Sequence, residues 1–101
     1  MKIVINGQYG GFSLNRAAYL RLRELGQKDA LAEDDPLLNG YASYCRDISR
    51  SDPLLAQVVG EMTAGGTYAD LRIVEVPDDV KWQIEEYDGL EWVAEAHRTW
   101  R

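Results

Sequence analysis

Residues 80–100 read VKWQIEEYDGLEWVAEAHRTW, and this stretch has the pattern of a β-hairpin. Apolar and polar residues alternate around the pair Asp88-Gly89, and an Asp-Gly pair between two such runs is a strong signal for a tight turn. The turn has two residues, Asp88 and Gly89, or three, if Tyr87 joins them and Gly89 forms a bulge. The C-terminal part of the chain is therefore predicted to be β-structure.

The two turns give different strand pairings. A two-residue turn places Glu86 opposite Glu91, so that like charges face each other. A three-residue turn gathers the apolar side chains on one face, with the pairs Trp82–Ala94 and Ile84–Trp92. Because this second register separates apolar from polar residues, we predict the three-residue turn, with both tryptophans in the core.

The other segments with clear signals are two strands and two helices. Residues 2–6 and residues 71–76 are rich in β-branched residues, as buried strands are. Ser13 or Asn15 can cap a helix that Gly26 ends, and the pair Asp52-Pro53 begins a second helix. Residues 27–52 show no clear pattern.

These elements predict one domain over residues 1–101, because a chain of this length supports a single modest core. We expect the α+β class: a small, mainly antiparallel sheet of about four strands, including the C-terminal hairpin, with two helices packed on one face. The first strand is expected to lie beside residues 71–76.

The net charge of −6 lies entirely in the last two-fifths of the chain. Residues 1–59 carry seven acidic and seven basic residues, whereas residues 60–101 carry ten acidic and four basic residues. A negative field repels the phosphate backbone and attracts basic surfaces. We therefore expect a partner with a basic surface and no direct binding of nucleic acid.

The composition is that of an ordinary globular protein, with 46% hydrophobic and 28% charged residues. No apolar run is long enough to cross a membrane, and the first residues lack the apolar region of a signal peptide. The single cysteine, Cys45, excludes an internal disulfide. We expect a cytoplasmic protein that does not bind membranes.

Residues 5–15, INGQYGGFSLN, have the order of strand, glycine loop and helix that many phosphate-binding sites share. However, Phe12 stands where a P-loop has its lysine, and the glycines lack the dinucleotide-binding spacing. We interpret residues 7–11 as a structural turn in which Gly10 and Gly11 take positive φ, with Tyr9 as a contact residue for a partner. A small enzyme or ligand-binding protein that uses residues 7–11 is the alternative.

No residue set in the sequence predicts catalysis or metal binding. His97, the single histidine, has no cysteine partner and no recognised metal-ligand spacing. The pairs Asp78-Asp79 and Glu85-Glu86 are chain neighbours, and neighbours on a strand point to opposite faces. We interpret Cys45 as a small core residue. We therefore expect no cofactor, no metal and no enzymatic activity.

Residues 5–15, residues 73–100 and the helix that begins at Asp52-Pro53 make the chain resemble a family of small phage and prophage proteins. The pattern of that family is INGxYGGFxL near the start and VPDDVxWxIEEYDGxEWVAExHRxW near the end. Residues 27–50 match poorly, so partner specificity is expected to differ there. The resemblance implies an origin in a virus or mobile element and supplies no catalytic residues. Small acidic proteins of that origin often inhibit host machinery, anti-CRISPR proteins among them.

The hairpin tip offers acidic and aromatic side chains together, which suit a basic protein surface. The residues predicted to bind a partner are Glu85, Glu86, Tyr87, Asp88, Glu91, Trp100 and Tyr9. We predict a non-enzymatic, phage-type inhibitor that binds a host protein in the host cytoplasm and blocks a basic nucleic-acid-binding site. The alternatives are an acidic hairpin that only keeps the protein soluble, and a structural phage accessory protein that forms a homodimer through a sheet edge or Trp100.

Overall fold

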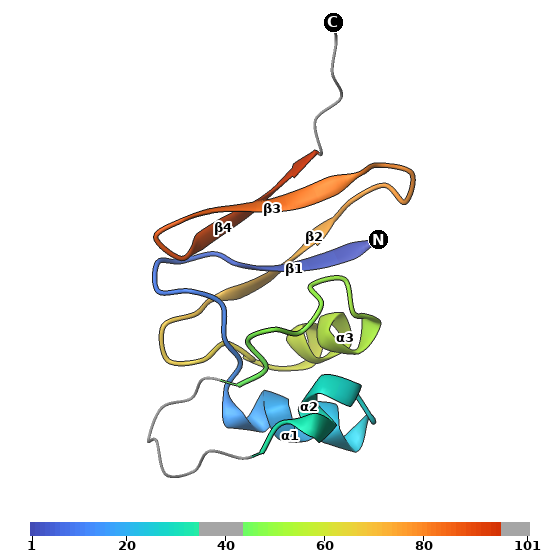
Figure 1. Ribbon diagram of the computed structural model, residues 1–101, viewed down its shortest axis with the longest axis vertical. Helices are drawn as coiled ribbons and strands as arrows, with labels where there is room; N and C mark the ends of the chain where they lie inside the picture. The colour runs from blue at the N-terminus through green and yellow to red at the C-terminus, as the bar shows by residue number, and fades with distance from the viewer. Residues whose placement is uncertain (35–43, 96–101) are drawn as a thin grey trace, which may run out of the picture.

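The computed structural model describes residues 1–34 and 44–95, which contain three helices and four strands (Figure 1). Their order is β1 (Lys2–Asn6), α1 (Arg16–Glu24), α2 (Lys28–Ala32), α3 (Pro53–Glu61), β2 (Leu71–Glu75), β3 (Trp82–Tyr87) and β4 (Leu90–Glu95). All pairings are antiparallel, and the strands form two two-stranded sheets, β1–β2 and β3–β4. The α+β class with a C-terminal hairpin is confirmed; the four strands divide into two sheets because β1 and β4 meet through side chains.

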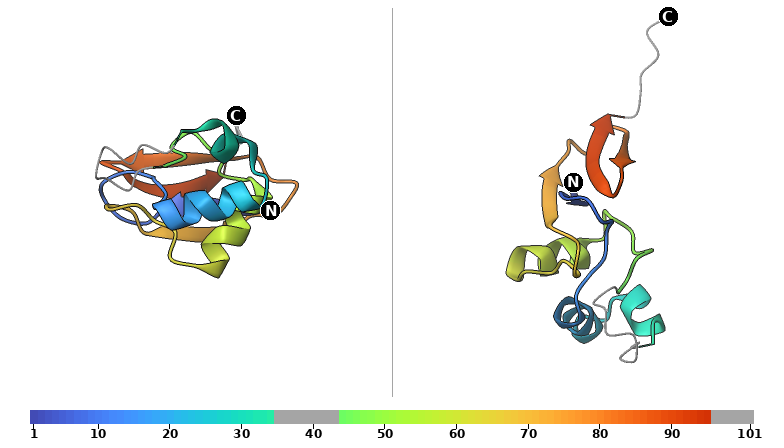
Figure 2. Two further views of the ribbon diagram at one scale, coloured as in Figure 1. Left: turned by 90° about the horizontal axis from the view of Figure 1, so that it is seen from below. Right: turned by 90° about the vertical axis from the view of Figure 1, so that its left-hand side faces the viewer.

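The elements form three layers, with β1 and β2 in the middle. Helix α3 packs on one side of the β1–β2 sheet with α1 and α2 beyond it, and the β3–β4 hairpin lies on the other side of the sheet (Figures 1 and 2). Val4 belongs to the core beneath the helices, whereas Ile3 and Ile5 are buried outside that core. Because successive side chains of a strand point to opposite faces, Ile3 and Ile5 face the hairpin. Strand β1 is therefore covered on both faces.

The structure selects Asn15 over Ser13 as the cap of the first predicted helix, and the second helix begins at the predicted pair Asp52-Pro53. The Asn15 side chain accepts a hydrogen bond from the Ala18 N–H at 2.9 Å, and Gly26 follows α1 with φ of +80°. The Asp52 carboxylate accepts the N–H groups of Leu54 and Leu55, with Pro53 at the first helical position. Helix α2 was not predicted, because its cap is Gln27, a residue type that rarely caps a helix.

The prediction that the first strand lies beside the second is confirmed. Lys2 pairs with Glu75 and Asn6 pairs with Leu71. The opposite edge of β1 is covered by other groups, because the Val4 N–H donates to the Arg50 carbonyl at 2.9 Å. On the same edge, the Asn6 N–H donates to the Glu91 carboxylate at 2.8 Å. Backbone groups on both edges of β1 are thus satisfied without a third strand.

The hairpin register differs from the prediction. Glu86 pairs with Glu91 and Tyr87 with Leu90, so the turn has two residues, and the predicted three-residue turn is wrong. Asp88 and Gly89 have φ of +52° and +92°, as a type I′ turn requires, and this turn matches the twist of the strands.

Other contacts reduce the repulsion between the like charges at this pair. Glu91 pairs with Arg50, and Glu86 accepts the Gly89 N–H at 2.9 Å. The changed register also moves the tryptophans: Trp92 is 43% exposed and lies outside the core, and Trp82 is only half-buried.

Candidate functional site

The hairpin tip (residues 86–91) lies directly on the glycine loop (residues 7–11). The Gly10 N–H donates to the Asp88 carbonyl at 3.2 Å. A Cβ atom on Gly89 would stand 2.2 Å from the Gly11 nitrogen and 2.5 Å from the Gly10 nitrogen, which leaves no room for a side chain. The approach is therefore backbone against backbone, and glycine is required at position 89.

The buried side chain of Asn6 holds the glycine loop and the hairpin tip together. This side chain is fully buried, and its Nδ2 donates to the carbonyls of Gln8 at 2.7 Å and Gly89 at 2.8 Å. Its Oδ1 accepts the Asp70 N–H at 2.9 Å. Both amide hydrogens are thus used, and one side chain joins the glycine loop, the hairpin tip and the entry to β2.

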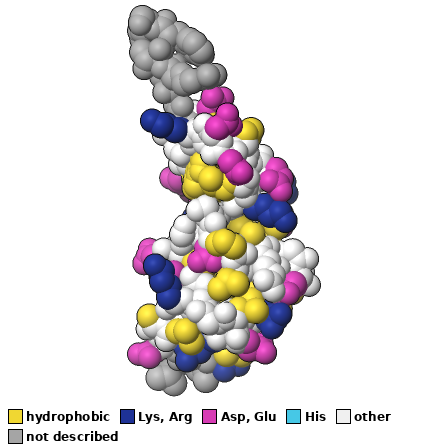
Figure 3. All heavy atoms as spheres, turned by 90° about the vertical axis from the view of Figure 1, so that its right-hand side faces the viewer, with side chains coloured by type: hydrophobic (Ala, Val, Ile, Leu, Met, Phe, Trp, Pro, Cys, Tyr) yellow, Lys and Arg dark blue, Asp and Glu magenta, His cyan; other side chains and the backbone are white. Residues whose placement is uncertain are grey.

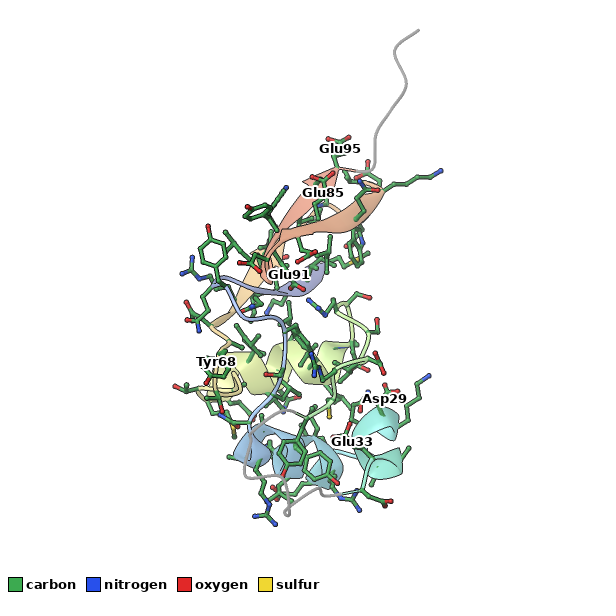
Figure 4. The ribbon with its side chains drawn as sticks, turned by 60° about the vertical axis from the view of Figure 1, so that its left-hand side comes forward. Asp29, Glu33, Tyr68, Glu85, Glu91 and Glu95 are labelled. Atoms are coloured by element: carbon green, nitrogen blue, oxygen red, sulfur yellow. The ribbon has the colours of Figure 1, made fainter. Side chains whose placement is uncertain are left out.

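Arg50 and Glu91 form the second connection between the hairpin and the rest of the fold. Two guanidinium nitrogens of Arg50 donate to the two carboxylate oxygens of Glu91, at 2.5 and 2.8 Å. The Arg50 guanidinium also stacks on the Phe12 ring, 3.6 Å from its centroid. The side chains are 18% and 9% exposed, and Glu91 lies between the hairpin and β1 (Figure 4). The prediction that Glu91 faces a partner is therefore corrected: it holds the hairpin in place.

Three of the predicted contact residues come together where the hairpin tip meets the glycine loop. Tyr9, Glu86 and Asp88, with the glycines between them, line an open hollow of about 610 Å³. Tyr9 is 59% exposed, and Tyr87 beside the hollow is 69% exposed. Residues from the two ends of the sequence thus form one acidic and aromatic surface.

The glycine loop uses its own N–H groups inside the protein. The Gly7 N–H donates to the Asp70 carbonyl at 2.7 Å, and the Gly10 N–H donates to Asp88. A phosphate-binding loop needs such groups free and convergent on the anion. The carboxylates of Glu86 and Asp88 beside the loop would also repel an anion. This geometry favours the interpretation of the loop as a turn that supports the hairpin.

The outer face of the hairpin, turned away from β1, carries the other predicted residues. Cross-strand pairing places Gln83 with Ala94, Glu85 with Trp92 and Tyr87 with Leu90 on this face. Glu85 Oε2 accepts the Trp92 indole N–H at 3.0 Å. Glu85 lies farther from β1 than Glu91 does (Figure 4). In Figure 3, the upper part of the visible face carries acidic side chains with hydrophobic and a few basic side chains among them.

Tyr68 is a surface residue that no sequence pattern singled out. It is 62% exposed, and a Cβ atom on Gly10 would stand 2.6 Å from its Cβ atom, so Tyr68 lies against the glycine loop. The turn that holds Tyr68 lies on the same side of the molecule as the glycine loop and the hairpin tip (Figures 1 and 4). The usable signal was an aromatic residue in a short turn between Gly66 and β2, where a side chain has little to pack against.

The described residues show no set of side chains arranged for metal binding or nucleophilic catalysis. Residues 1–34 and 44–95 contain no group of three His, Cys, Asp or Glu side chains placed to hold an ion. Burial raises the pKa of the Cys45 thiol to about 12, with a further contribution from the charges of Glu33 and Asp29. The Cys45 thiol is therefore a poor nucleophile. His97 and Trp100 lie outside the described residues.

No helix in the described part of the chain has the length and apolar character needed to span a membrane. Comparison of the chain with protein families, with curated proteins and with solved structures gives no match. The contacts and charges of the described residues therefore carry the binding proposal that follows.

Proposed function

We propose that this protein is a non-enzymatic binding protein whose β3–β4 hairpin docks on a basic surface of another protein. The observation that carries the proposal is the charge of the hairpin: residues 82–95 contain five acidic residues and no basic residue. Arg50 neutralises Glu91, and the carboxylates of Glu85, Glu86 and Asp88 lie in exposed positions. Such a surface attracts cationic partners and steers their approach.

The aromatic residues among these acids support the same conclusion. Tyr87, Trp92 and Tyr9 are all exposed, although burial of such large rings would stabilise the fold. Tyrosine and tryptophan contribute much of the binding energy at protein interfaces. The hollow beside Tyr9 is open to solvent, so it suits a side chain that protrudes from a partner better than an enclosed small molecule.

The rigidity of the hairpin also favours binding. The bonds from Asn6 and the ion pair with Arg50 fix the tip before any partner arrives. A fixed surface loses little conformational freedom on association, and this raises affinity. From the resemblance to phage proteins, we extend the proposal to a host protein: the acidic hairpin occupies its nucleic-acid-binding site, in the host cytoplasm, as anti-CRISPR proteins do.

Affinity capture with charge-reversed variants tests the proposal. The test variant carries Glu85→Lys, Glu86→Lys and Asp88→Lys. The control variant carries Glu24→Lys, Asp34→Lys and Asp47→Lys, which are exposed acids outside the hairpin, so the two variants have the same net charge. Each tagged protein is incubated with a nuclease-treated host lysate, and the captured proteins are identified and assayed for nucleic-acid binding.

We expect the wild type and the control to capture the same basic protein and to inhibit its binding to nucleic acid, and the test variant to do neither. Capture should also weaken as the salt concentration rises, because the contact is electrostatic. Undiminished capture and inhibition by the test variant would overturn the proposal, and so would an equal loss in both variants.

A further inference from the structure

The outer face of the hairpin is an unpartnered sheet face with a mixed character. Tyr87, Leu90 and Trp92 lie on it beside Glu85, and Tyr87 and Trp92 are 69% and 43% exposed. Apolar side chains that gather on an exposed face, with charged side chains around them, are typical of an interaction site. On the inner face, by contrast, the apolar side chains of Trp82, Ile84 and Val93 are partly buried against the middle layer.

Glu85 and Trp92 form a fixed pair on this face. They are direct cross-strand partners, and the indole N–H of Trp92 donates to Glu85 Oε2 at 3.0 Å. Gln83 Nε2 donates to Glu85 Oε1 at 3.2 Å, so the carboxylate is held from both sides. Each carboxylate oxygen can accept a further hydrogen bond. The result is a flat aromatic ring with a carboxylate fixed at its edge.

An aromatic ring and a carboxylate also bind an arginine together on the inner face of the hairpin. There the guanidinium of Arg50 stacks on the Phe12 ring at 3.6 Å and donates two hydrogen bonds to Glu91. On the outer face, Glu85 takes the place of Glu91 and Trp92 takes the place of Phe12. In the described part of the chain, no basic side chain forms an ion pair with Glu85.

We propose that Trp92 and Glu85 form a subsite for an arginine side chain of a protein partner, with Tyr87 at its margin. This inference rests on the proposed function and specifies its chemistry. A guanidinium is planar, stacks on aromatic rings and donates paired hydrogen bonds to a carboxylate, whereas a lysine ammonium is a compact charge that does neither as well. The subsite therefore selects arginine over lysine.

Charge argues for a foreign partner on this face and against a second copy of the chain. A symmetric contact through the outer face would place the same patch of each copy against the other. The carboxylate of Glu85, and that of Asp88 in the adjoining turn, would then meet their own copies, which is unfavourable. A basic segment of another protein places positive charge there instead.

Titration with two defined peptides tests the subsite. One peptide alternates glycine with arginine, and the other replaces every arginine by lysine. Each is added at low salt to the ¹⁵N-labelled full chain, and the Trp92 indole N–H signal, assigned by its loss in Trp92→Leu, is followed by NMR. We expect the arginine peptide to shift this signal and to bind about fivefold more tightly than the lysine peptide.

Matched variants complete the test. We expect Glu85→Gln to lose the preference for arginine, and Asp79→Asn, which removes an exposed acid outside the hairpin, to keep it. Equal affinity for the two peptides, or a preference that survives in Glu85→Gln, would overturn the subsite and leave the basic-partner proposal standing. If neither peptide binds the wild type, the subsite is also overturned, and the capture experiment alone then decides the proposed function.

Discussion

The side-chain amide of Asn6 donates a hydrogen bond to the carbonyl of Gly89, so the first strand is joined to a turn 83 residues later in the chain. The same side chain also binds the glycine loop and the first residue before β2. The buried amide of Asn6 thus binds three segments and stabilises the part of the molecule where the glycine loop and the hairpin tip meet.

Replacement of Asn6 by alanine should therefore destabilise the protein by about 2–3 kcal/mol, because the carbonyl of Gly89 and the N–H of Asp70 lose their partner. Chemical denaturation followed by circular dichroism measures the change. Gln8→Ala, whose side chain is exposed, is the control and should change the free energy of unfolding by less than about 0.5 kcal/mol. If the free energy of unfolding fell by similar amounts in the two variants, the hydrogen bonds of the Asn6 side chain would not be the source of the stability.

Removal of Glu91 should have a comparable effect. Glu91→Ala leaves the largely buried guanidinium of Arg50 unpaired, which we expect to cost about 3 kcal/mol. Glu85→Ala removes an exposed carboxylate from the same hairpin and should cost less than about 1 kcal/mol. The double variant Arg50→Met with Glu91→Leu should recover much of the loss, because no charge remains unpaired. A double variant that is no more stable than Glu91→Ala would contradict this account.

Gly11 and Gly89 both have positive φ, and replacing each by alanine distinguishes the cost of backbone strain from the cost of a steric clash. Gly11 has φ of +93° and open space around its Cα, so Gly11→Ala should cost about 1 kcal/mol through strain alone. Gly89 has φ of +92°, and any Cβ there would also collide with the glycine loop, so Gly89→Ala should cost at least about 2 kcal/mol. Thermal unfolding of both variants measures the difference. Equal losses would mean that the hairpin tip does not rest on the loop.

The thiol of Cys45 should be protected in the folded protein. Its pKa of about 12 lies three units above the ordinary value of 9.0, so at pH 8 the folded protein holds about a thousandfold less thiolate than the unfolded chain. Labelling with a thiol reagent at pH 8 should therefore be slow and should become fast in guanidinium chloride. Rapid labelling of the folded protein would show that the thiol is neither buried nor shifted.

The same pKa shift sets a pH dependence of stability. Well below pH 9 the Cys45 thiol is almost fully protonated in both states, so this group has little effect on stability there. Between pH 9 and about 12 the unfolded chain releases the proton while the folded protein keeps it, so the free energy of unfolding falls as the pH rises. The decrease above pH 9 should be smaller in Cys45→Ala, and identical pH profiles in the two proteins would contradict the shift.

The sequence predicted the elements whose signals are local. The side chains of Asn15 and Asp52 cap helices through hydrogen bonds to N–H groups only two or three positions away, Pro53 follows Asp52 at the first helical position, and these helix starts are confirmed. The pairing of the first strand with the second was also predicted correctly, since few strands were available. Helix α2 was missed because it has only five residues and is capped by Gln27, a residue type that is not a usual capping signal.

The hairpin register could not be obtained from the hairpin alone. The separation of apolar from polar residues and the repulsion between Glu86 and Glu91 both favoured the three-residue turn. However, Arg50 pairs with Glu91 and reduces that repulsion, and Arg50 lies in a segment whose sequence has no recognisable pattern. The site was predicted in part for the same reason. Tyr9, Glu86 and Asp88 come together as contact residues, whereas Glu91 is taken by Arg50 and Tyr68 was not foreseen.

The position of β1 between two layers has a consequence for the order of folding. Its backbone and Asn6 bind groups at Arg50, in residues 70–76 and at Glu91, all of which follow it by more than forty positions. On the ribosome, β1 therefore emerges before these partners and can complete its contacts only after β4 has begun to emerge. Until then its apolar residues stay exposed, so the period of synthesis is when this protein is most open to chaperones and to aggregation.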